Sequence, residues 1–349
     1  LSVLMVDFSC ALKLSMPIAV LSAMKEASTH QLLVKGGRFM EAVSEADTIL
    51  FDKTGTLTQG VFSLTEVHPA EGWDKEQVLR LAALAEQFSN PPISRSIQEA
   101  CADDLTGVEV TDVQERGGHG ITAQADGHTI AVGNQRLMDA LNVAVPSDLN
   151  LNGTTVLVAC NGVYVGVILV ADQVKVGAKE ALSKLKAVGV GKTVMLTGDG
   201  DAPAAAVAKE LGVDEYHSKL LPVDKVTLLE QLLEQERPVA FVGDGVNDAP
   251  VLTRADVGIA MGAMGSDVAI QSADIALMNN DLNNIPFVMS LARSTKSIMY
   301  QNIGIAFSVS LIMMILAAVG VIPALAGAFL HNIGAFVILI NSSRILRDS

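Results

Sequence analysis

The fold of this chain is decided by residues 48–58, TILFDKTGTLT. The first four residues form a short apolar run that predicts a strand, and Asp52 follows at its carboxyl end. A carboxylate in that position can act as a nucleophile and form an acyl phosphate. The Gly and Thr residues after it can turn N–H groups and hydroxyls toward phosphoryl oxygens. Taken alone, the pattern also fits a strand-to-turn junction with ordinary polar capping.

Two more apolar runs end in polar residues: 193–196 before Thr197-Gly198-Asp199, and 239–242 before GDGVNDAP at 243–250. Strands that alternate with helices and end in polar residues predict a doubly wound parallel sheet. Ligands bind outside the carboxyl ends of such strands. The helical patterns lie at 176–188, 202–211 and 225–236.

The polar residues at these strand ends suit phosphoryl transfer. Asp244 and Asp248 lie four residues apart on a Gly-rich turn and suit Mg²⁺, which takes one or two carboxylates with phosphate oxygens and water. Asp248 could instead cap the helix that follows. Thr197 can hydrogen-bond a phosphoryl oxygen, and Lys225 offers a fixed cation. A lone Lys that opens a helix is usually solvated, but these features together predict an aspartyl-phosphate site.

Composition narrows the class of protein. The 349 residues include 24 Lys and Arg against 38 Asp and Glu, and the net charge of −14 argues against a nucleic-acid partner. A hydrophobic content of 50% excludes intrinsic disorder. The three cysteines, Cys10, Cys101 and Cys160, form no disulfide pattern, which suits a reducing cytosol.

Apolar stretches near both ends predict membrane helices over 1–24, 299–319 and 324–343. A bilayer core of about 30 Å needs about 20 helical residues. Basic residues flank the last two stretches, with Arg293 before them and Arg344 after them, so the positive-inside rule puts both ends in the cytoplasm. We expect a multi-pass protein in contact with lipid. A buried helical hairpin in a soluble core is the alternative.

Residues 61–167 interrupt the strand–helix alternation. Two helical patterns, 74–88 and 93–103, precede a series of alternating strands punctuated by glycines. This predicts an inserted α+β domain. The strands are expected at 108–116, 120–125, 128–132, 154–159 and 163–169.

DKTGTLT, TGD and GDGVNDAP, in this order, resemble the motifs of P-type ATPases, whose catalytic domain has the haloacid-dehalogenase fold. The resemblance runs over essentially the whole chain. It implies that ATP phosphorylates Asp52 and that Asp52, Thr54 and Asp244 hold Mg²⁺. The other catalytic residues that it implies are Lys53, Thr197, Gly198, Asp199, Lys225, Asn247 and Asp248.

The resemblance also divides the chain into segments. A membrane helix with a metal-site triplet is followed by a phosphorylation domain in two parts, with a nucleotide-binding domain inserted between them, and two membrane helices come last. The expected bounds are 1–24 for the first helix, 25–60 for the linker and first part, 61–167 for the insertion, 168–290 for the second part, and 299–319 and 324–343 for the last helices.

The short insertion and the two membrane helices after the core are similar to the heavy-metal-transporting branch of the family. There Glu86 and two glycine motifs would surround the adenine and ribose of ATP; the motif residues are Gly118, Gly120, Gly133 and Asn134. The sequence departs from the family at Pro91, which replaces a His near the adenine. Because proline offers no side-chain hydrogen bond, we expect weaker ATP binding.

The triplet Phe8-Ser9-Cys10 resembles the Cys-Pro-Cys triplet that carries the transported metal in this branch. Ionisable residues inside a membrane are costly and are treated as functional by default. Cys10, Asp7 and His331 are therefore candidate ligands of a transported heavy-metal cation. A carboxylate and a thiolate suit Zn²⁺ or Mn²⁺ better than Cu⁺. The alternatives are a buried structural Cys10, an Asp7–Lys13 salt bridge and a hydrogen bond from His331 to a neighbouring helix.

Residues 1–349 contain no Thr-Gly-Glu, the sequence of the family's actuator domain, which hydrolyses the aspartyl phosphate. We expect the C-terminal half of a pump of a bacterial plasma membrane, whose N-terminal half carries the actuator domain and the earlier membrane helices. One alternative is a membrane-tethered phosphatase, although Thr54 stands where those enzymes have a second Asp. The other is a degenerate ATPase remnant that binds or regulates another membrane protein, which Pro91 favours and the intact Asp52 motif opposes.

Overall fold

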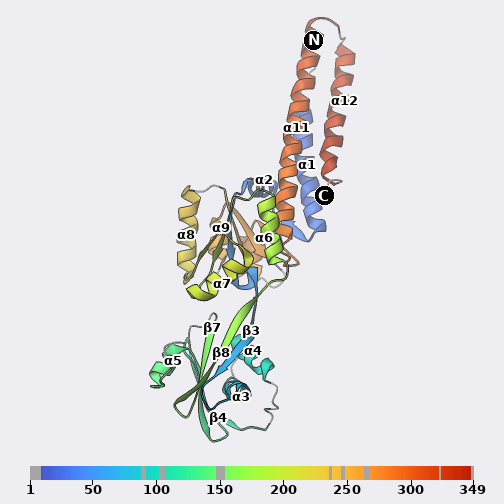
Figure 1. Cartoon of the computed structure of the whole chain (residues 1–349). Helices are drawn as coiled ribbons and strands as arrows, with labels where there is room; N and C mark the ends of the chain where they lie inside the picture. Colours follow the sequence, from blue (N-terminus) through green and yellow to red (C-terminus); the bar gives the residue numbers. More distant parts are fainter. Residues whose placement is uncertain are drawn as a thin grey trace. The chain divides into compact units, whose positions relative to one another are not determined.

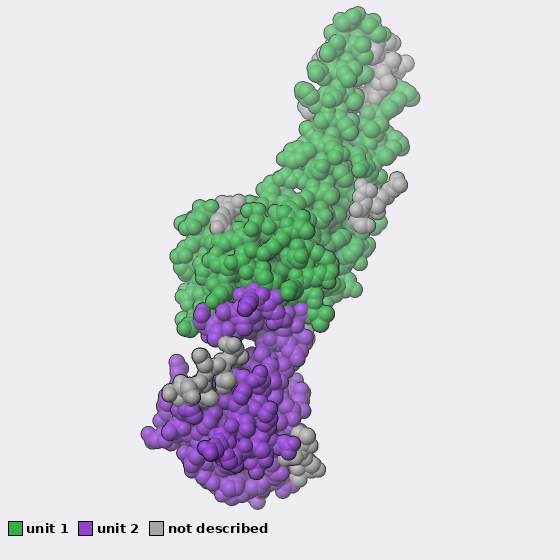
Figure 2. All heavy atoms as spheres, viewed as in Figure 1, with its two compact units in different colours: residues 1–52, 176–196, 211–349 green, residues 53–175, 197–210 purple. Residues whose placement is uncertain are grey.

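A computed structural model of the chain (Figure 1) describes residues 9–87, 92–101, 105, 107–146, 154–235, 238–244, 248–262, 267–321 and 324–346. The chain divides into two compact units, which Figure 2 colours separately. Unit 1 comprises residues 1–52, 176–196 and 211–349, and unit 2 comprises residues 53–175 and 197–210.

Unit 1 is built on a seven-stranded sheet in the order β1-β13-β12-β11-β2-β9-β10. All neighbouring strands pair in parallel except β1 with β13, so the expected doubly wound parallel sheet is confirmed. The strands are β1 (Leu32–Val34), β2 (Thr48–Asp52), β9 (Lys192–Leu196), β10 (Glu215–His217), β11 (Val239–Gly243), β12 (Val257–Met261) and β13 (Ile275–Leu277).

The middle strands of this sheet are buried along their whole length. Every residue of β2, β11 and β12 is buried, as expected for parallel strands that helices cover on both faces. Leu50, Val194 and Phe241 belong to one apolar core with residues of the helices. The helices that follow or precede these strands are α2 (Gly37–Glu45), α6 (Ala178–Ala187), α7 (Asp201–Leu211, shared with unit 2), α8 (Pro222–Gln235), α9 (Ala249–Arg254) and α10 (Asp267–Ser272).

Unit 2 contains a six-stranded antiparallel sheet in the order β3-β8-β7-β6-β5-β4. The sheet reaches beyond the expected insertion 61–167, because its two longest strands, β3 and β8, pair over almost their whole length. The elements are β3 (Thr58–Pro69), α3 (Lys75–Ala85), α4 (Pro92–Ala100), β4 (Val110–Arg116), β5 (Gly120–Ala125), β6 (His128–Gly133), α5 (Gln135–Ala140), β7 (Thr154–Cys160) and β8 (Val163–Val174).

Three long helices complete unit 1: α1 (Ser9–Thr29), α11 (Asn284–Ala318) and α12 (Ala324–Ser343), followed by the short turn η4 (Arg344–Leu346). The expected helix 299–319 is only the second part of α11, which begins 15 residues earlier. Its first turns bury Ile285 and Val288 and so belong to the core of unit 1. Arg293 donates to the carbonyl oxygens of Ser44, at 3.0 Å, and Ala46, at 3.4 Å.

Within the described ranges, α11 is the one helix long and apolar enough to cross a membrane. Its second part exposes large apolar side chains, among them Phe307 and Ile312. A buried amide joins the three long helices: Asn302 donates to Ser342 Oγ at 2.9 Å and accepts from Asn341 Nδ2 at 2.9 Å. Ser342 in turn lies 3.5 Å from the carbonyl oxygen of Ser15 on α1. Such hydrogen bonds are typical of helices that pack in a membrane.

Two glycines let β5 and β6 approach closely at one end of their pairing. A Cβ at Gly120, where φ is +139°, would lie 2.2 Å from Val132 O and 2.5 Å from Gly133 Cα. A Cβ at Gly133 would lie 2.3 Å from His119 O. These contacts involve backbone atoms that cannot move away, so the glycines are required by the local fold.

We therefore predict that Gly120→Ala destabilises unit 2 by about 2 kcal/mol or more, because it combines a backbone clash with an unfavourable φ. The measurement is chemical denaturation followed by the fluorescence of Trp73, which packs against the core of unit 2. Gly117→Ala is the matched control, since a Cβ there meets no atom within 4 Å. Equal stability of the two variants would contradict the prediction.

Candidate active site

Asp52 ends the buried strand β2 and carries the centre of the site. Its register places it beside Leu196 on β9, while Phe51 pairs with Val242 on β11. Asp52 is only 6% exposed. The ammonium of Lys225, at the start of α8, donates to Asp52 Oδ1 at 2.5 Å and to Asp248 Oδ1 at 2.9 Å. The structure thus brings together three of the residues predicted from sequence.

Asp248 reaches this ammonium because Gly243 leaves room for it. A Cβ on Gly243 would lie 2.9 Å from Asp248 Oδ2 and 2.8 Å from the ring of Phe241. Asp248 precedes α9, but its side chain does not cap that helix and is only 2% exposed. The alternative of a simple helix cap is therefore wrong.

The carboxylates of Asp52, Asp244 and Asp248 form one cluster. Each contributes an oxygen that lies within 4.8 Å of the others. Burial and the neighbouring charge of Asp248 raise the pKa of Asp52 to about 7, against the opposing effect of Lys225. Burial lowers the pKa of Lys225, but Asp52 and Asp248 outweigh it and raise that pKa above its ordinary value. Three carboxylates thus face one ammonium, and a further cation would relieve their repulsion.

This donor set fits Mg²⁺. The ion prefers oxygen ligands and is usually held by one or two carboxylates together with phosphate oxygens. Asp52 and Asp244 can supply those carboxylates, while Lys225 holds Asp248. The Mg²⁺ assignment of Asp52, Asp244 and Thr54 remains a prediction, since Thr54 belongs to the loop that opens unit 2.

The loop after Asp52 is anchored within unit 2 by a second ionic cluster. The buried ammonium of Lys53 lies 2.5 Å from Asp199 Oδ2 and 3.8 Å from Asp172 Oδ2. Asp172 also accepts hydrogen bonds from the Thr58 hydroxyl and, at 3.0 Å, from the N–H of Gly60. Burial raises the pKa of Asp172, although the hydrogen bond from Thr58 and the charge of Lys53 oppose this.

Asp172 was not predicted as a site residue. The signal in the sequence is that Asp172 is the only charged residue of the long apolar run 163–174. The same loop holds Thr56, whose hydroxyl is buried without a hydrogen-bond partner in the described part of the chain. Gly55 adopts a φ of +76° there, as expected for a backbone that turns sharply.

The remaining predicted catalytic residues are placed as follows. Thr197 is 2% exposed and its hydroxyl accepts from the N–H of Asp199 at 3.1 Å, and Gly198 lies between them in unit 2. Asn247 lies outside the described residues. Their roles toward a phosphoryl group remain predictions.

Unit 2 contains a pocket of about 320 Å³ that all five predicted nucleotide-site residues line: Glu86, Gly118, Gly120, Gly133 and Asn134. Glu86, the C-terminal cap of α3, is buried and accepts from the hydroxyl of Ser94 at 2.6 Å. Asn134 donates to Gly118 O at 2.8 Å. Residues far apart in the sequence thus meet in one cavity of a size that suits a small ligand.

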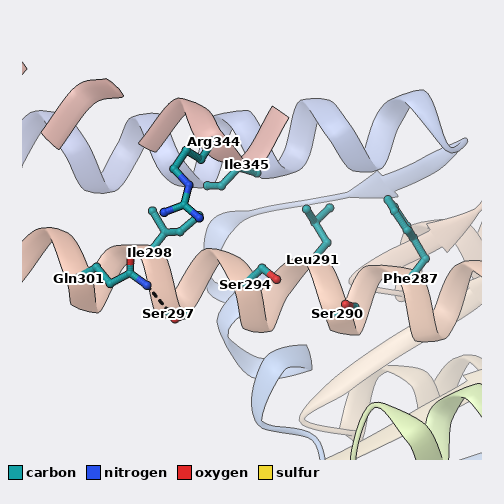
Figure 3. Close-up of a pocket in the computed structure, with 9 residues that line it drawn as sticks. All are labelled: Phe287, Ser290, Leu291, Ser294, Ser297, Ile298, Gln301, Arg344 and Ile345. Atoms are coloured by element: carbon teal, nitrogen blue, oxygen red, sulfur yellow. Dashed lines mark hydrogen bonds between the residues drawn. The ribbon is translucent and has the colours of Figure 1, made fainter. Parts of the chain in front are cut away.

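A second pocket, of about 370 Å³, lies between α11 and η4 (Figure 3). Its polar groups are the hydroxyls of three serines, the amide of Gln301 and the guanidinium of Arg344. Gln301 lies 3.5 Å from Ser297 Oγ. The lining has no carboxylate and none of the predicted site residues, so the chemistry predicted from sequence belongs to the other sites.

The side chains of the three candidate ligands of a transported metal lie outside the described part of the structure. Asp7 lies outside the described residues. Cys10 lies on α1 and His331 on α12, but the placement of their side chains is outside the described part of the structure. Their assignment therefore remains a prediction.

The chain is similar to known proteins over nearly its whole length. The haloacid dehalogenase-like hydrolase family matches residues 46–256. The chain is 40% identical to the cadmium, zinc and cobalt-transporting ATPase of Bacillus subtilis (strain 168), over 99% of this chain and 49% of that protein. It is 39% identical to the zinc-transporting ATPase of Synechocystis sp., over 99% of this chain and 48% of that protein.

Among solved structures, the chain resembles that of a zinc-transporting PIB-type ATPase in its E2.Pi state. The TM-score is 0.83 at 35% identity, over 97% of this chain and 56% of the other. The chain spans about half the length of the curated relatives it matches.

The raised pKa of Asp52 makes stability depend on pH. The pKa of Asp52 is about 7 in the folded chain and 3.8 as a free residue. The stability that its protonated carboxyl group contributes to the fold is therefore fully present below pH 3.8 and is lost as the pH rises through 7. We predict that at pH 8 Asp52→Asn is more stable than the wild type by a few kcal/mol, on the order of 2–4. At pH 4 the difference should be small. Urea denaturation in detergent without divalent ions measures it.

Mg²⁺ provides the second part of this test. At pH 8 it should stabilise the wild type and leave Asp52→Asn almost unchanged, because binding favours the ionised carboxylate. Asp126→Asn is the control, since Asp126 lies in an exposed ion pair with Arg80. A pH-independent difference between wild type and Asp52→Asn would contradict the account.

Proposed function

Since the chain belongs to the haloacid dehalogenase-like hydrolase family and, within it, to the heavy-metal-transporting P-type ATPases, we propose that Asp52 accepts the γ-phosphoryl group of ATP. The observation that carries the proposal is the bridge of the Lys225 ammonium between Asp52 and Asp248 in a buried cluster of carboxylates.

In the proposed step, an ionised oxygen of Asp52 attacks the γ-phosphorus. An O–P bond forms at Asp52, the bond from the γ-phosphorus to the bridging oxygen breaks, and ADP leaves with that electron pair. Lys225 holds the attacking carboxylate in place and compensates negative charge that spreads over the phosphoryl oxygens. Asp248 fixes the ammonium from the other side. When bound, Mg²⁺ supplies further positive charge to those oxygens.

The residue two positions after Asp52 favours a persistent phosphoenzyme over a phosphatase. The phosphatases that this fold resembles carry a second Asp, a general acid, two residues after the nucleophile, and this chain has Thr54 there. Unlike a carboxyl group, an aliphatic hydroxyl is neither an effective general acid nor an effective general base near neutral pH. Hydrolysis of an aspartyl phosphate would therefore be slow in this chain alone.

ATP is the proposed phosphoryl donor because the pocket of unit 2 gathers all of the expected nucleotide residues around the buried Glu86. The proposed contacts of Thr54, Thr197 and Asn247 with the phosphoryl group are carried over from the family resemblance. The expected nucleotide-binding domain, 61–167, lies wholly within unit 2.

We further propose that phosphorylation drives transport of a divalent heavy-metal cation by the whole protein. The curated relatives described above are named for cadmium, zinc and cobalt or for zinc, and a thiolate at Cys10 with a carboxylate at Asp7 would suit such ions. The apolar part of α11 supports a place in a membrane. We propose a multi-pass arrangement in a bacterial plasma membrane, with the parallel sheet of unit 1 and the whole of unit 2 in the cytoplasm.

Labelling with [γ-³²P]ATP and Mg²⁺ tests the proposed nucleophile. We predict an acid-stable, hydroxylamine-sensitive label that Asp52→Asn abolishes. Lys225→Met should slow labelling by about 100-fold or more, because one preorganised charge is lost. Asp126→Asn should label as the wild type does. A label that persists in Asp52→Asn would refute Asp52 as the phosphoryl acceptor.

A second prediction concerns the effect of Pro91 on ATP affinity. If the proline weakens ATP binding by removing a hydrogen-bond donor, Pro91→His should raise ATP affinity by about fivefold to tenfold, the value of one hydrogen bond. Calorimetric titration with ATP measures the change, and Pro91→Ala controls for relief of the proline's backbone constraint. Equal affinities of the His and Ala variants would show that an imidazole at this position does not contribute.

A further inference from the structure

The turn between β4 and β5 forms one wall of the nucleotide pocket. This wall carries a charged group that has no assigned role. Arg116 ends β4 and lines the pocket together with Glu86 and Glu115. Among the lining residues, all of which the structure describes, Arg116 is the only Lys or Arg. It is therefore the only permanent positive charge that this pocket can offer to a ligand.

Three hydrogen bonds hold the backbone of this turn in place. The N–H of His119 donates to Arg116 O at 2.9 Å, and the N–H of Asn134 donates to His119 O at 2.9 Å. The side chain of Asn134 also donates to Gly118 O, at 2.8 Å. The close approach of Gly120 to Gly133 fixes the other side of the turn. Arg116 thus extends from a well-defined backbone position.

Its guanidinium is exposed and, within the described part of the chain, makes no hydrogen bond or ion pair. Two other basic residues of unit 2 are paired: Arg80 lies 3.0 Å from Asp126, and Lys53 lies 2.5 Å from Asp199. In a chain of net charge −14, an unpaired guanidinium on a pocket wall is available to an anion. The planar guanidinium matches phosphate oxygens in two-point hydrogen bonds.

The opposite chemistry occurs elsewhere in the same pocket. The carboxyl group of Glu86 is buried and accepts a hydrogen bond from Ser94 at 2.6 Å. A carboxylate there repels phosphate but can accept hydrogen bonds from an uncharged, amine-bearing base. A nucleotide has one uncharged end and one anionic end: the base suits Glu86, as the family resemblance implies, and the phosphates suit the guanidinium of Arg116, which lies next to Glu115 in the lining.

We infer that Arg116 binds the phosphate chain of a nucleotide whose base lies at Glu86, where the family resemblance already puts the adenine. This inference rests on the proposed function, since it assumes that the pocket of unit 2 binds ATP. It makes Arg116 a binding residue that distinguishes phosphorylated nucleotides from nucleosides.

Calorimetric titrations of the full chain with ATP, ADP and adenosine test it. Arg116→Gln should weaken ATP and ADP by about tenfold, the value of a charge-assisted hydrogen bond, and leave adenosine affinity within about twofold of the wild type. Arg116→Lys should lose less than Arg116→Gln, because it keeps the charge. The matched control is Arg136→Gln, an exposed arginine of α5 outside the pocket lining, which should change nothing.

Two results would overturn the inference alone: an ATP affinity of Arg116→Gln equal to that of the wild type, or equal losses for ATP and adenosine, which would indicate a general disturbance of the pocket. Failure of the wild type to bind either ATP or adenosine would instead refute the proposed nucleotide site, and the inference with it. The melting temperature of each variant confirms that the fold is retained.

Discussion

One ammonium between two buried carboxylates is the interaction on which the phosphorylation site depends. Lys225 neutralises part of the charge that Asp52, Asp244 and Asp248 bring into a largely buried space, and without it the cluster would hold three mutually repelling groups. Despite the effect of Lys225, burial and the charge of Asp248 raise the pKa of Asp52 to about 7. The site is therefore built to receive more positive charge, which a divalent cation provides, before Asp52 can act as an ionised nucleophile.

The parallel sheet creates this cluster from segments far apart in the sequence. Because β2 lies between β11 and β9, their carboxyl ends come to the same edge of the sheet. Asp52 ends β2 itself, and the glycine that ends β11 leaves room for Asp248. Unit 2 likewise brings residues that are far apart in the sequence to one site. There an antiparallel sheet and the cap of α3 bring a buried carboxylate, two glycine motifs and a free guanidinium to one pocket.

The parallel sheet and the site residues at the ends of its strands could be predicted from sequence, because short apolar runs that end in polar motifs indicate parallel strands. The side-chain contacts of Lys225 with Asp52 and Asp248 have no local signal in the sequence and required the structure. Asp172 was missed because it lies inside an apolar strand, and its partners come from β3 and the loop before it. The start of α11 was misplaced because Arg293 interrupts the apolar run, although it is the contact that fastens this helix to α2.

The most direct test of the central claim is the carboxyl titration of Asp52 itself, followed by ¹³C NMR and assigned with Asp52→Asn. We expect Asp52 to titrate near pH 7 without divalent ions. With Mg²⁺ its pKa should fall well below that value, because the bound cation favours the ionised form. An Asp52 that titrates near pH 4, with or without Mg²⁺, would contradict it.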